Sequence, residues 1–160
     1  MAKRSDRTAD MVLGGLLLEA ASGLRHELDK VHAEQGLIGR EFDALLRLFH
    51  SPGNELRMTE LARQTQTSTS GATALIDRLE KRGLVRRSTD PADRRSYRAR
   101  LTDAGREAVE RAMSAVLPVI RRLLVEPLGT DRAEFERHLR KVRDAANPDA
   151  TLHGSLRMER

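Results

Sequence analysis

The sequence has 160 residues, no cysteine and no tryptophan, and a formal net charge of +5 at pH 7. This length provides one domain with an adequate core and leaves no room for a second, catalytic domain. Because cysteine is absent, disulfides, thiolate metal sites and thiol redox switches are excluded as well.

An amphipathic helix is predicted over about residues 8–33, where apolar side chains recur every three or four residues. Its apolar run over 11–18 is too short to span a bilayer. The two acids before this run and the two glycines within it are atypical of a signal peptide. We therefore expect a cytoplasmic protein with no membrane partner.

A second helix is predicted over about residues 40–50, and the turn sequence S-P-G-N follows it. Thr59 is the predicted N-cap of a short helix over 60–64, and Ser68 that of the helix after it. In this later helix the apolar residues fall at i, i+3, i+4 and i+7, and Gly83 marks its end. The predicted buried stripe consists of Ala72, Leu75, Ile76 and Leu79, and the exposed face of Thr69, Ser70, Thr73 and Asp77.

Positive charge is concentrated between residues 78 and 100, where nine arginines and lysines face three acids. Two short alternating runs flank the sequence D-P-A-D, which predicts a basic β-hairpin. Tyr97, Ala99 and Leu101 are expected to face the helices, with arginines on the other face. Nucleic acid is the polyanion that such a hairpin favours, and a solvated charged hairpin is the alternative.

Thr102 is the predicted N-cap of a long helix, in which Pro118 can cause a bend. The pair Gly129 and Thr130 ends this helix and begins a last one, and a polar tail is predicted over 147–160. Together these elements predict a mainly α fold with a small β-hairpin.

Two short helices joined by a tight turn and followed by a basic hairpin form the pattern of a winged helix-turn-helix, whose second helix enters the major groove. Serine and threonine let that helix come close to base edges, and a wing arginine can enter a narrow minor groove. Lysine and arginine would serve phosphate binding better, so the small polar face favours sequence recognition.

Residues 61–105 closely resemble the MarR (multiple-antibiotic-resistance regulator) family of bacterial transcription factors. The matching residues are L-A-R-Q-T-Q-T-S-T-S-G-A-T-A-L-I-D-R-L-E-K-R-G-L-V, then D-P-A-D-R-R, then L-T-D-A-G. The helix order on both sides also fits, as far as about residue 146. The resemblance implies one MarR-like domain over 1–160, with a winged lobe over about 40–102 and dimerisation helices over about 8–33 and 103–146.

The resemblance also implies which residues meet DNA. On the recognition helix these are Ser68, Thr69, Ser70, Gly71, Thr73 and Ala74. At the wing tip, Arg95 is expected to probe the minor groove and Asp93 to orient the wing through a charge-assisted bond. Phosphate contacts are expected from Arg86, Arg94 and Arg98. For Arg78 two interpretations stay open, a DNA contact and an ion pair with Asp77 that braces the helix.

Two positions depart from the family pattern. Ala74 stands where many members carry a long basic or polar residue, so contact with a base there is expected to be apolar, for example with a thymine methyl group, or absent. Gly71 replaces a more common β-branched residue, which costs helix stability and permits closer approach.

The terminal helices are too apolar for a monomer of this size, which predicts a homodimer, with a self-contained helical bundle as the alternative. The resemblance implies that these helices interleave. It also implies a palindromic operator with half-sites about 10 bp apart on double-stranded DNA.

Family members commonly bind small, often anionic aromatic ligands in a crevice between the dimer helices and the DNA-binding lobe. In this chain the crevice is expected near residues 21–25, residues 43–50 and Arg106, and the effector to be a phenol or carboxylate. The sequence T-S-T-S-G-A-T resembles urate-responsive members, but their ligand site uses a tryptophan, so urate is not expected. The five histidines are too dispersed for a metal site; we expect surface or interface histidines, no metal and no cofactor.

The main functional hypothesis is a homodimeric, sequence-specific transcriptional repressor that a small ligand releases from DNA. The alternative is an architectural or nucleoid-type protein that binds DNA without an effector. An enzyme is not expected, because the sequence carries no phosphate-binding loop, nucleophile elbow, paired-carboxylate signature or metal-ligand spacing.

Overall fold

The computed structural model describes the backbone of residues 2–90 and 93–146 and the side chains of residues 7–90 and 96–146. The predicted polar tail over 147–160 and the centre of the predicted hairpin turn lie outside these residues. Most of the described chain is helical, with one small antiparallel sheet. This confirms the predicted fold class.

The elements follow one another as two helix-rich segments around the sheet. The α-helices are α1 (Ala2–Glu34), α2 (Gly39–Phe49), α3 (Met58–Gln64), α4 (Thr69–Lys81), α5 (Asp103–Ile120), α6 (Glu126–Leu128) and α7 (Arg132–Ala146). Short 3-10 turns η1 (Pro52–Asn54) and η3 (Gly129–Asp131) and a π-helical segment η2 (Arg121–Val125) connect them. The strands are β1 (Glu55–Arg57), β2 (Val85–Asp90) and β3 (Asp93–Leu101), in the order β1-β3-β2.

The sheet has one strand more than the sequence predicts. β1 pairs with β3 from Glu55 opposite Arg100 to Arg57 opposite Arg98. Its three residues are too few to show an alternating pattern, so periodicity could not reveal it. β1 leads directly into α3, which begins at the buried Met58 and places Arg57 at the cap position. The prediction of Thr59 as the N-cap is therefore wrong.

The core lies in the lobe formed by α2, α3, α4, the sheet and the first half of α5. Its fully buried side chains include Leu45, Leu48, Leu61, Ile76, Leu79, Val85 and Val109. The predicted buried stripe of α4 is confirmed at all four positions. Tyr97 was expected to pack inward but is 54% exposed. It pairs with Thr89 and lies beyond the end of β1, where the sheet has only two strands.

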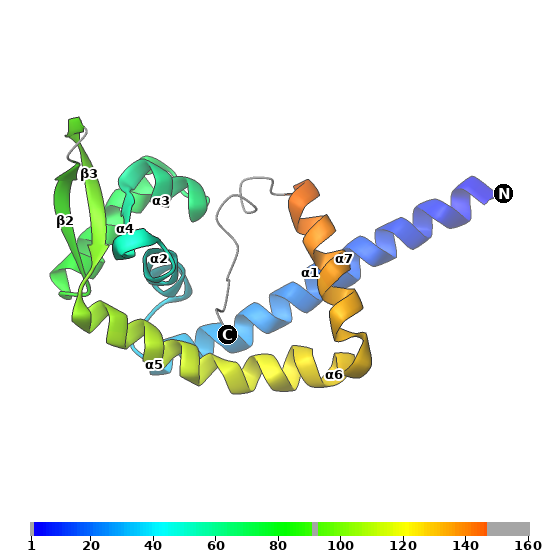
Figure 1. Ribbon diagram of the computed structural model, residues 1–160. Coiled ribbons are helices and arrows are strands. Elements are labelled where there is room, and N and C mark those ends of the chain that lie inside the picture. The colour runs from blue at the N-terminus through cyan, green and yellow to red at the C-terminus, as the bar shows by residue number, and fades with distance from the viewer. Residues whose placement is uncertain (1, 91–92, 147–160) are drawn as a thin grey trace.

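The terminal helices extend away from this lobe. In Figure 1 α1 runs from the lobe to the far N-terminal end, while α5 continues through α6 towards α7 on the same side. α1 packs against α5 near the lobe, but further out Met11 is 78% and Leu18 73% exposed. The described chain stays helical through Pro118 and takes its π-helical form just after it. No described helix is long and apolar enough to cross a membrane.

A tight backbone contact joins the segment that follows α4 to the start of α5. Gly83 has φ +71° and ends α4, as predicted. The Thr102 hydroxyl donates to the Gly83 carbonyl at 2.7 Å and accepts from the Gly105 amide at 3.0 Å, which confirms Thr102 as the N-cap of α5. A Cβ on Gly105 would lie 2.0 Å from the Leu84 carbonyl oxygen, so the backbones meet too closely for any side chain.

Candidate nucleic-acid interface

A compact turn joins α3 to α4 and sets the angle between the two helices. Gln66 takes a left-handed conformation with φ +52°. The Thr67 amide donates to the Ala62 carbonyl at 2.9 Å, and the Thr65 hydroxyl donates to the Leu61 carbonyl at 2.8 Å. These bonds satisfy backbone carbonyl groups at the end of α3 that have no partner within the helix. A short turn is therefore sufficient to connect α3 to α4.

The first two turns of α4 present a small, uncharged, exposed surface. The Ser68 hydroxyl oxygen accepts from the Gly71 amide at 3.0 Å and lies 3.0 Å from the Ser70 hydroxyl oxygen, which confirms Ser68 as the N-cap. The Thr73 hydroxyl donates to the Thr69 carbonyl at 2.9 Å. The structure thus brings together, exposed, the six predicted residues Ser68, Thr69, Ser70, Gly71, Thr73 and Ala74.

Ion pairs fix the other end of α4 to its surroundings. Arg82 donates to the Glu41 carboxylate at 2.8 Å and to the Gly36 carbonyl at 2.8 Å, and Arg78 Nε lies 3.8 Å from the same carboxylate. The predicted pair between Asp77 and Arg78 is not what braces the helix, because adjacent residues point to different sides of it. Arg78 turns to α2 instead, and its side chain stays 52% exposed.

Arg87 connects the wing to the recognition helix. Its guanidinium pairs with Asp77 and donates to the Thr73 carbonyl at 3.0 Å, and its amide donates to the Glu80 carboxylate at 2.9 Å. Several charge-assisted bonds therefore hold β2 against α4. Arg86, the residue of β2 before Arg87, is exposed.

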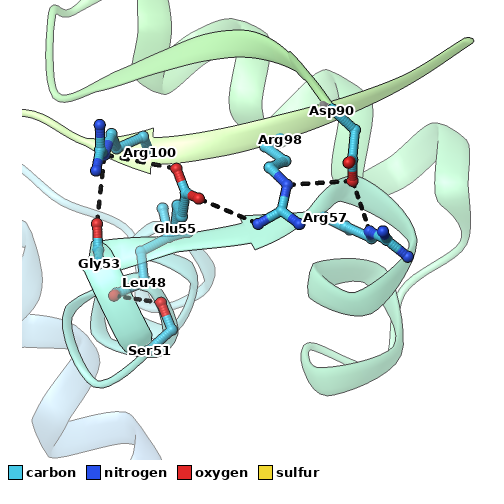
Figure 2. Close-up of polar contacts among 8 residues, drawn as sticks. All are labelled: Leu48, Ser51, Gly53, Glu55, Arg57, Asp90, Arg98 and Arg100. Carbon is cyan, nitrogen blue, oxygen red and sulfur yellow. Dashed lines mark hydrogen bonds and ion pairs between the residues drawn. The ribbon is translucent and has the colours of Figure 1, made fainter. Parts of the chain in front are cut away.

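Within the sheet, arginines are compensated by two acids (Figure 2). The buried Asp90 carboxylate accepts from Arg57 Nε at 2.5 Å and from Arg98 Nε at 3.1 Å. Glu55 accepts from Arg98 at 3.1 Å and pairs with Arg100 at 3.5 Å. The expected cationic face is thus largely neutralised here, and the Arg98 side chain is only 26% exposed.

The predicted wing-tip residues are placed by their backbone alone. β3 begins at Asp93, which pairs with Asp90 of β2. The side chains of Asp93, Arg94 and Arg95 lie outside the described residues, so their DNA contacts stay predictions.

Sequence reasoning missed the acids that organise the interface. Glu41 is only 6% exposed and Asp90 only 1%, although both carry a charge. Asp90 was taken for a turn residue because it precedes Pro91. The available signal was its position as an isolated acid at the end of a basic strand, since buried acids need cationic partners.

The residues predicted for a ligand crevice partly come together. The Arg106 guanidinium lies over the Phe49 ring, 5.4 Å from its centroid, and the Phe49 and His50 rings are 5.2 Å apart. Partial burial and nearby Arg47 lower the pKa of His50. A cation and an aromatic ring thus face each other where α2 meets the start of α5. Residues 21–23 and 25 of α1 are exposed and Leu24 is half-buried.

His32 corrects the prediction that the histidines lie at a surface or interface. It is 5% exposed and stacks on Phe42 with ring centroids 4.4 Å apart. Within the described chain neither ring nitrogen has a hydrogen-bond partner, and the Asp29 carboxylate is 3.8 Å from Nδ1. Burial lowers the pKa of His32, and Asp29 acts in the opposite direction. Among the described side chains, no three of His, Asp and Glu are placed to hold a metal ion.

Comparison with known proteins identifies the family. Residues 35–96 match the model of the MarR family. The transcriptional repressor MprA of Escherichia coli (strain K12) is 26% identical over 133 residues, which cover 83% of this chain and 76% of MprA.

Solved structures agree in fold. Sco3205, a MarR family transcriptional regulator from Streptomyces coelicolor in complex with DNA, matches with a TM-score of 0.79 and 29% identity over 88% of this chain and 89% of its own. The Mycobacterium tuberculosis MarR family protein Rv2887, in complex with p-aminosalicylic acid, matches with a TM-score of 0.65 and 32% identity over 81% of this chain and 97% of its own. This chain belongs to the MarR family of transcriptional regulators.

Proposed function

We propose that the protein is a homodimeric repressor that binds a palindromic operator in double-stranded DNA and is released by a small phenolic or carboxylate ligand. The observation that carries this proposal is the exposed face at the start of α4. The turn from α3 positions this face on one side, and Arg87 of the wing braces it on the other. A rigid, uncharged helix face of this kind fits base edges in the major groove.

In this proposal the whole chain is one functional domain with two parts. The winged lobe over about 40–102 binds DNA, and the helices over about 8–33 and 103–146 form the dimer. Support for the dimer comes from apolar side chains that a lone protomer leaves in water, such as Leu13 at 70% and Leu16 at 58% exposure. A partner copy with the same helices would cover this face.

The DNA contacts are divided by chemistry. Base edges are contacted by the start of α4, which presents Ser68, Thr69, Ser70, Gly71, Thr73 and Ala74. Arg95 enters the minor groove with Asp93 orienting it, and Arg86 and Arg94 bind phosphates. Arg78 and Arg98, which are already paired with acids, add weaker phosphate contacts through their exposed edges.

A ligand site is supported by one relative and one contact. Rv2887 was crystallised with p-aminosalicylic acid, which is both a phenol and a carboxylate. In this chain the Arg106 guanidinium and the Phe49 ring offer a charge partner and a stacking surface for that class of molecule.

Footprinting on the DNA upstream of the protein's own gene tests specificity and release together. A two-fold protected site that is lost when phenolic or carboxylate ligands are added is the expected result. Even protection over unrelated DNA would instead support the alternative, an architectural protein in the nucleoid of the cytoplasm. The uncharged start of α4 favours the specific regulator, because charge alone would suffice for the architectural protein.

Arg95→Ala tests the wing assignment. Loss of a defined minor-groove contact should weaken operator binding by about 1–3 kcal/mol. Arg111→Ala is the control, because Arg111 lies on α5 and pairs with Glu107. Equal operator affinity of the two variants at physiological salt would remove Arg95 from the site.

A further inference from the structure

We infer that the recognition helix identifies thymine by its C5 methyl group, with Thr73 contributing its own methyl group to that contact. The inference deepens the proposed function and rests on it, because it concerns the same helix face. It is based on the hydrogen bonds that the hydroxyl groups of that face already make within the protein.

The Thr73 hydroxyl is turned towards its own helix. It donates to the Thr69 carbonyl at 2.9 Å, one turn earlier. A threonine hydroxyl has a single proton to donate, so this bond leaves none for a base. The γ-methyl group of Thr73 occupies another staggered position on the same exposed side chain.

Two neighbouring hydroxyls, those of Ser68 and Ser70, are also engaged. Ser68 accepts from the Gly71 amide, and the Ser68 and Ser70 oxygens share a hydrogen bond of 3.0 Å. Their shared bond uses one of the two hydroxyl protons, so together these serines offer a base at most one donor. Gly71 and Ala74 complete the exposed face without any polar side-chain atom.

The residue types that bind guanine or adenine through two hydrogen bonds are missing from this stretch of the sequence. Residues 68–76 include no arginine or lysine to bind guanine and no asparagine or glutamine to bind adenine. Asp77 and Arg78, which follow, are paired with Arg87 and Glu41. In the major groove, the thymine methyl is the apolar group that distinguishes one base pair from another. Because Gly71 and Ala74 have small side chains or none, α4 can approach the bases closely. The thymine methyl group then comes within contact distance of Thr73.

Deoxyuridine provides the direct test, since it lacks only this methyl group. After footprinting has located the operator, each thymine in it is replaced singly by deoxyuridine and the affinity of the full chain is measured. We expect a three- to fivefold loss at one or two positions in each half-site, about the value of one buried methyl group. Replacements between the half-sites should have smaller effects.

Two substitutions separate the methyl group from the hydroxyl. Thr73→Ser keeps the hydroxyl and should abolish the preference for thymine over uracil at one position. Thr73→Val keeps a methyl group and should retain that preference. Ser114→Ala is the matched control, because Ser114 makes the same type of bond to the Glu110 carbonyl at 2.9 Å on an exposed part of α5. It should change neither affinity nor preference. Thermal unfolding checks that each variant is folded.

The possible results are distinct. If thymine and uracil operators bind equally, or if Thr73→Ser keeps the preference and Thr73→Val loses it, the inference is wrong and the proposed function stands. If the wild-type chain protects no two-fold site on unsubstituted DNA, the proposed function fails and the inference fails with it.

Discussion

The winged lobe and the terminal helices differ in how far their apolar side chains are buried within the protomer. In the lobe, Leu45, Leu48 and Ile76 are completely buried by residues of the same protomer. On α1, Met11, Leu13 and Leu18 are each at least 70% exposed. The lobe therefore buries its apolar side chains within the protomer, whereas α1 leaves these side chains exposed, which supports the proposed dimer. Mutations in the two regions should have different consequences, one for folding and the other for assembly.

The largest effect is expected from Leu13→Asp, which should disrupt assembly without unfolding the lobe. In the proposed dimer each copy would lose a leucine that the partner covers, worth about 2 kcal/mol, so the dimer should be weakened by about 4 kcal/mol. Sedimentation over a range of concentrations measures this, and urea unfolding reports on the lobe. Ser22→Asp, also exposed on α1, is the control. An unchanged dimer would show that this apolar face meets solvent.

Gly105→Ala should damage the lobe directly. The added Cβ would lie 2.0 Å from the Leu84 carbonyl oxygen, so the backbones must separate at a cost of roughly 3 kcal/mol in the free energy of unfolding. Gly23→Ala on α1 is the matched control, because its Cβ would have no described atom within 4 Å. Urea unfolding compares the two. Equal stability of both variants would contradict the close contact between α5 and Leu84.

Asp90→Asn should have a moderate effect, on the ion pairs that join the wing to β1. The amide keeps the shape of the side chain but removes the charge that holds Arg57 and Arg98. Because both guanidinium groups are partly exposed, the expected loss of unfolding free energy is about 1–3 kcal/mol. Operator affinity should fall as well, since the wing is less well oriented. Asp103→Asn, at the exposed start of α5, should leave that affinity unaltered.

The smallest effect concerns pH and His32. Burial lowers its pKa below the ordinary value of 6.5, so the unfolded chain binds a proton more readily than the folded protein. The resulting stabilisation is complete above about pH 6.5 and is lost as the pH falls below it. Unfolding measured at about pH 8 and about pH 5.5 tests this.

His32→Phe keeps a ring against Phe42 and should reduce the dependence on pH. It should not remove it, because the pKa of His50 is lowered too. An identical pH slope in wild type and variant would exclude His32 as a contributor.

Features that depend on neighbours in the sequence could be predicted. The buried stripe of α4 follows from helical periodicity, and Ser68, Gly83 and Thr102 take positions for which their own chemistry suits them. The exposed positions of Thr69, Ser70 and Thr73 followed from the same periodicity, whereas the full set of six at the start of α4 came from the resemblance to the MarR family.

Features that depend on distant contacts could not be predicted from the same patterns. Arg57 and Asp90 are 33 residues apart, and Glu41 and Arg82 are 41 apart. Periodicity and turn signals describe only neighbouring residues and do not indicate such pairs. From the sequence, the arginines of the wing were therefore expected to be available for phosphate. Strand β1 was not predicted for a different reason: it is a strand because it pairs with β3, not because of its composition.

The contact of Thr102 and Gly105 with the end of α4 also has a mechanical consequence. Because Gly83 and Leu84, which follow α4, are in direct backbone contact with the start of α5, a pivot of α4 independent of α5 would have to break this contact. A tilt of α5 would then move α4 with it as a rigid body. In the proposed dimer, the displacement of α4 would grow with its distance from the dimer axis. In the proposed dimer, the angle between the two α5 helices would thus set which half-site spacing the protein can span. A ligand would then need only to change that angle, without approaching the DNA-binding face.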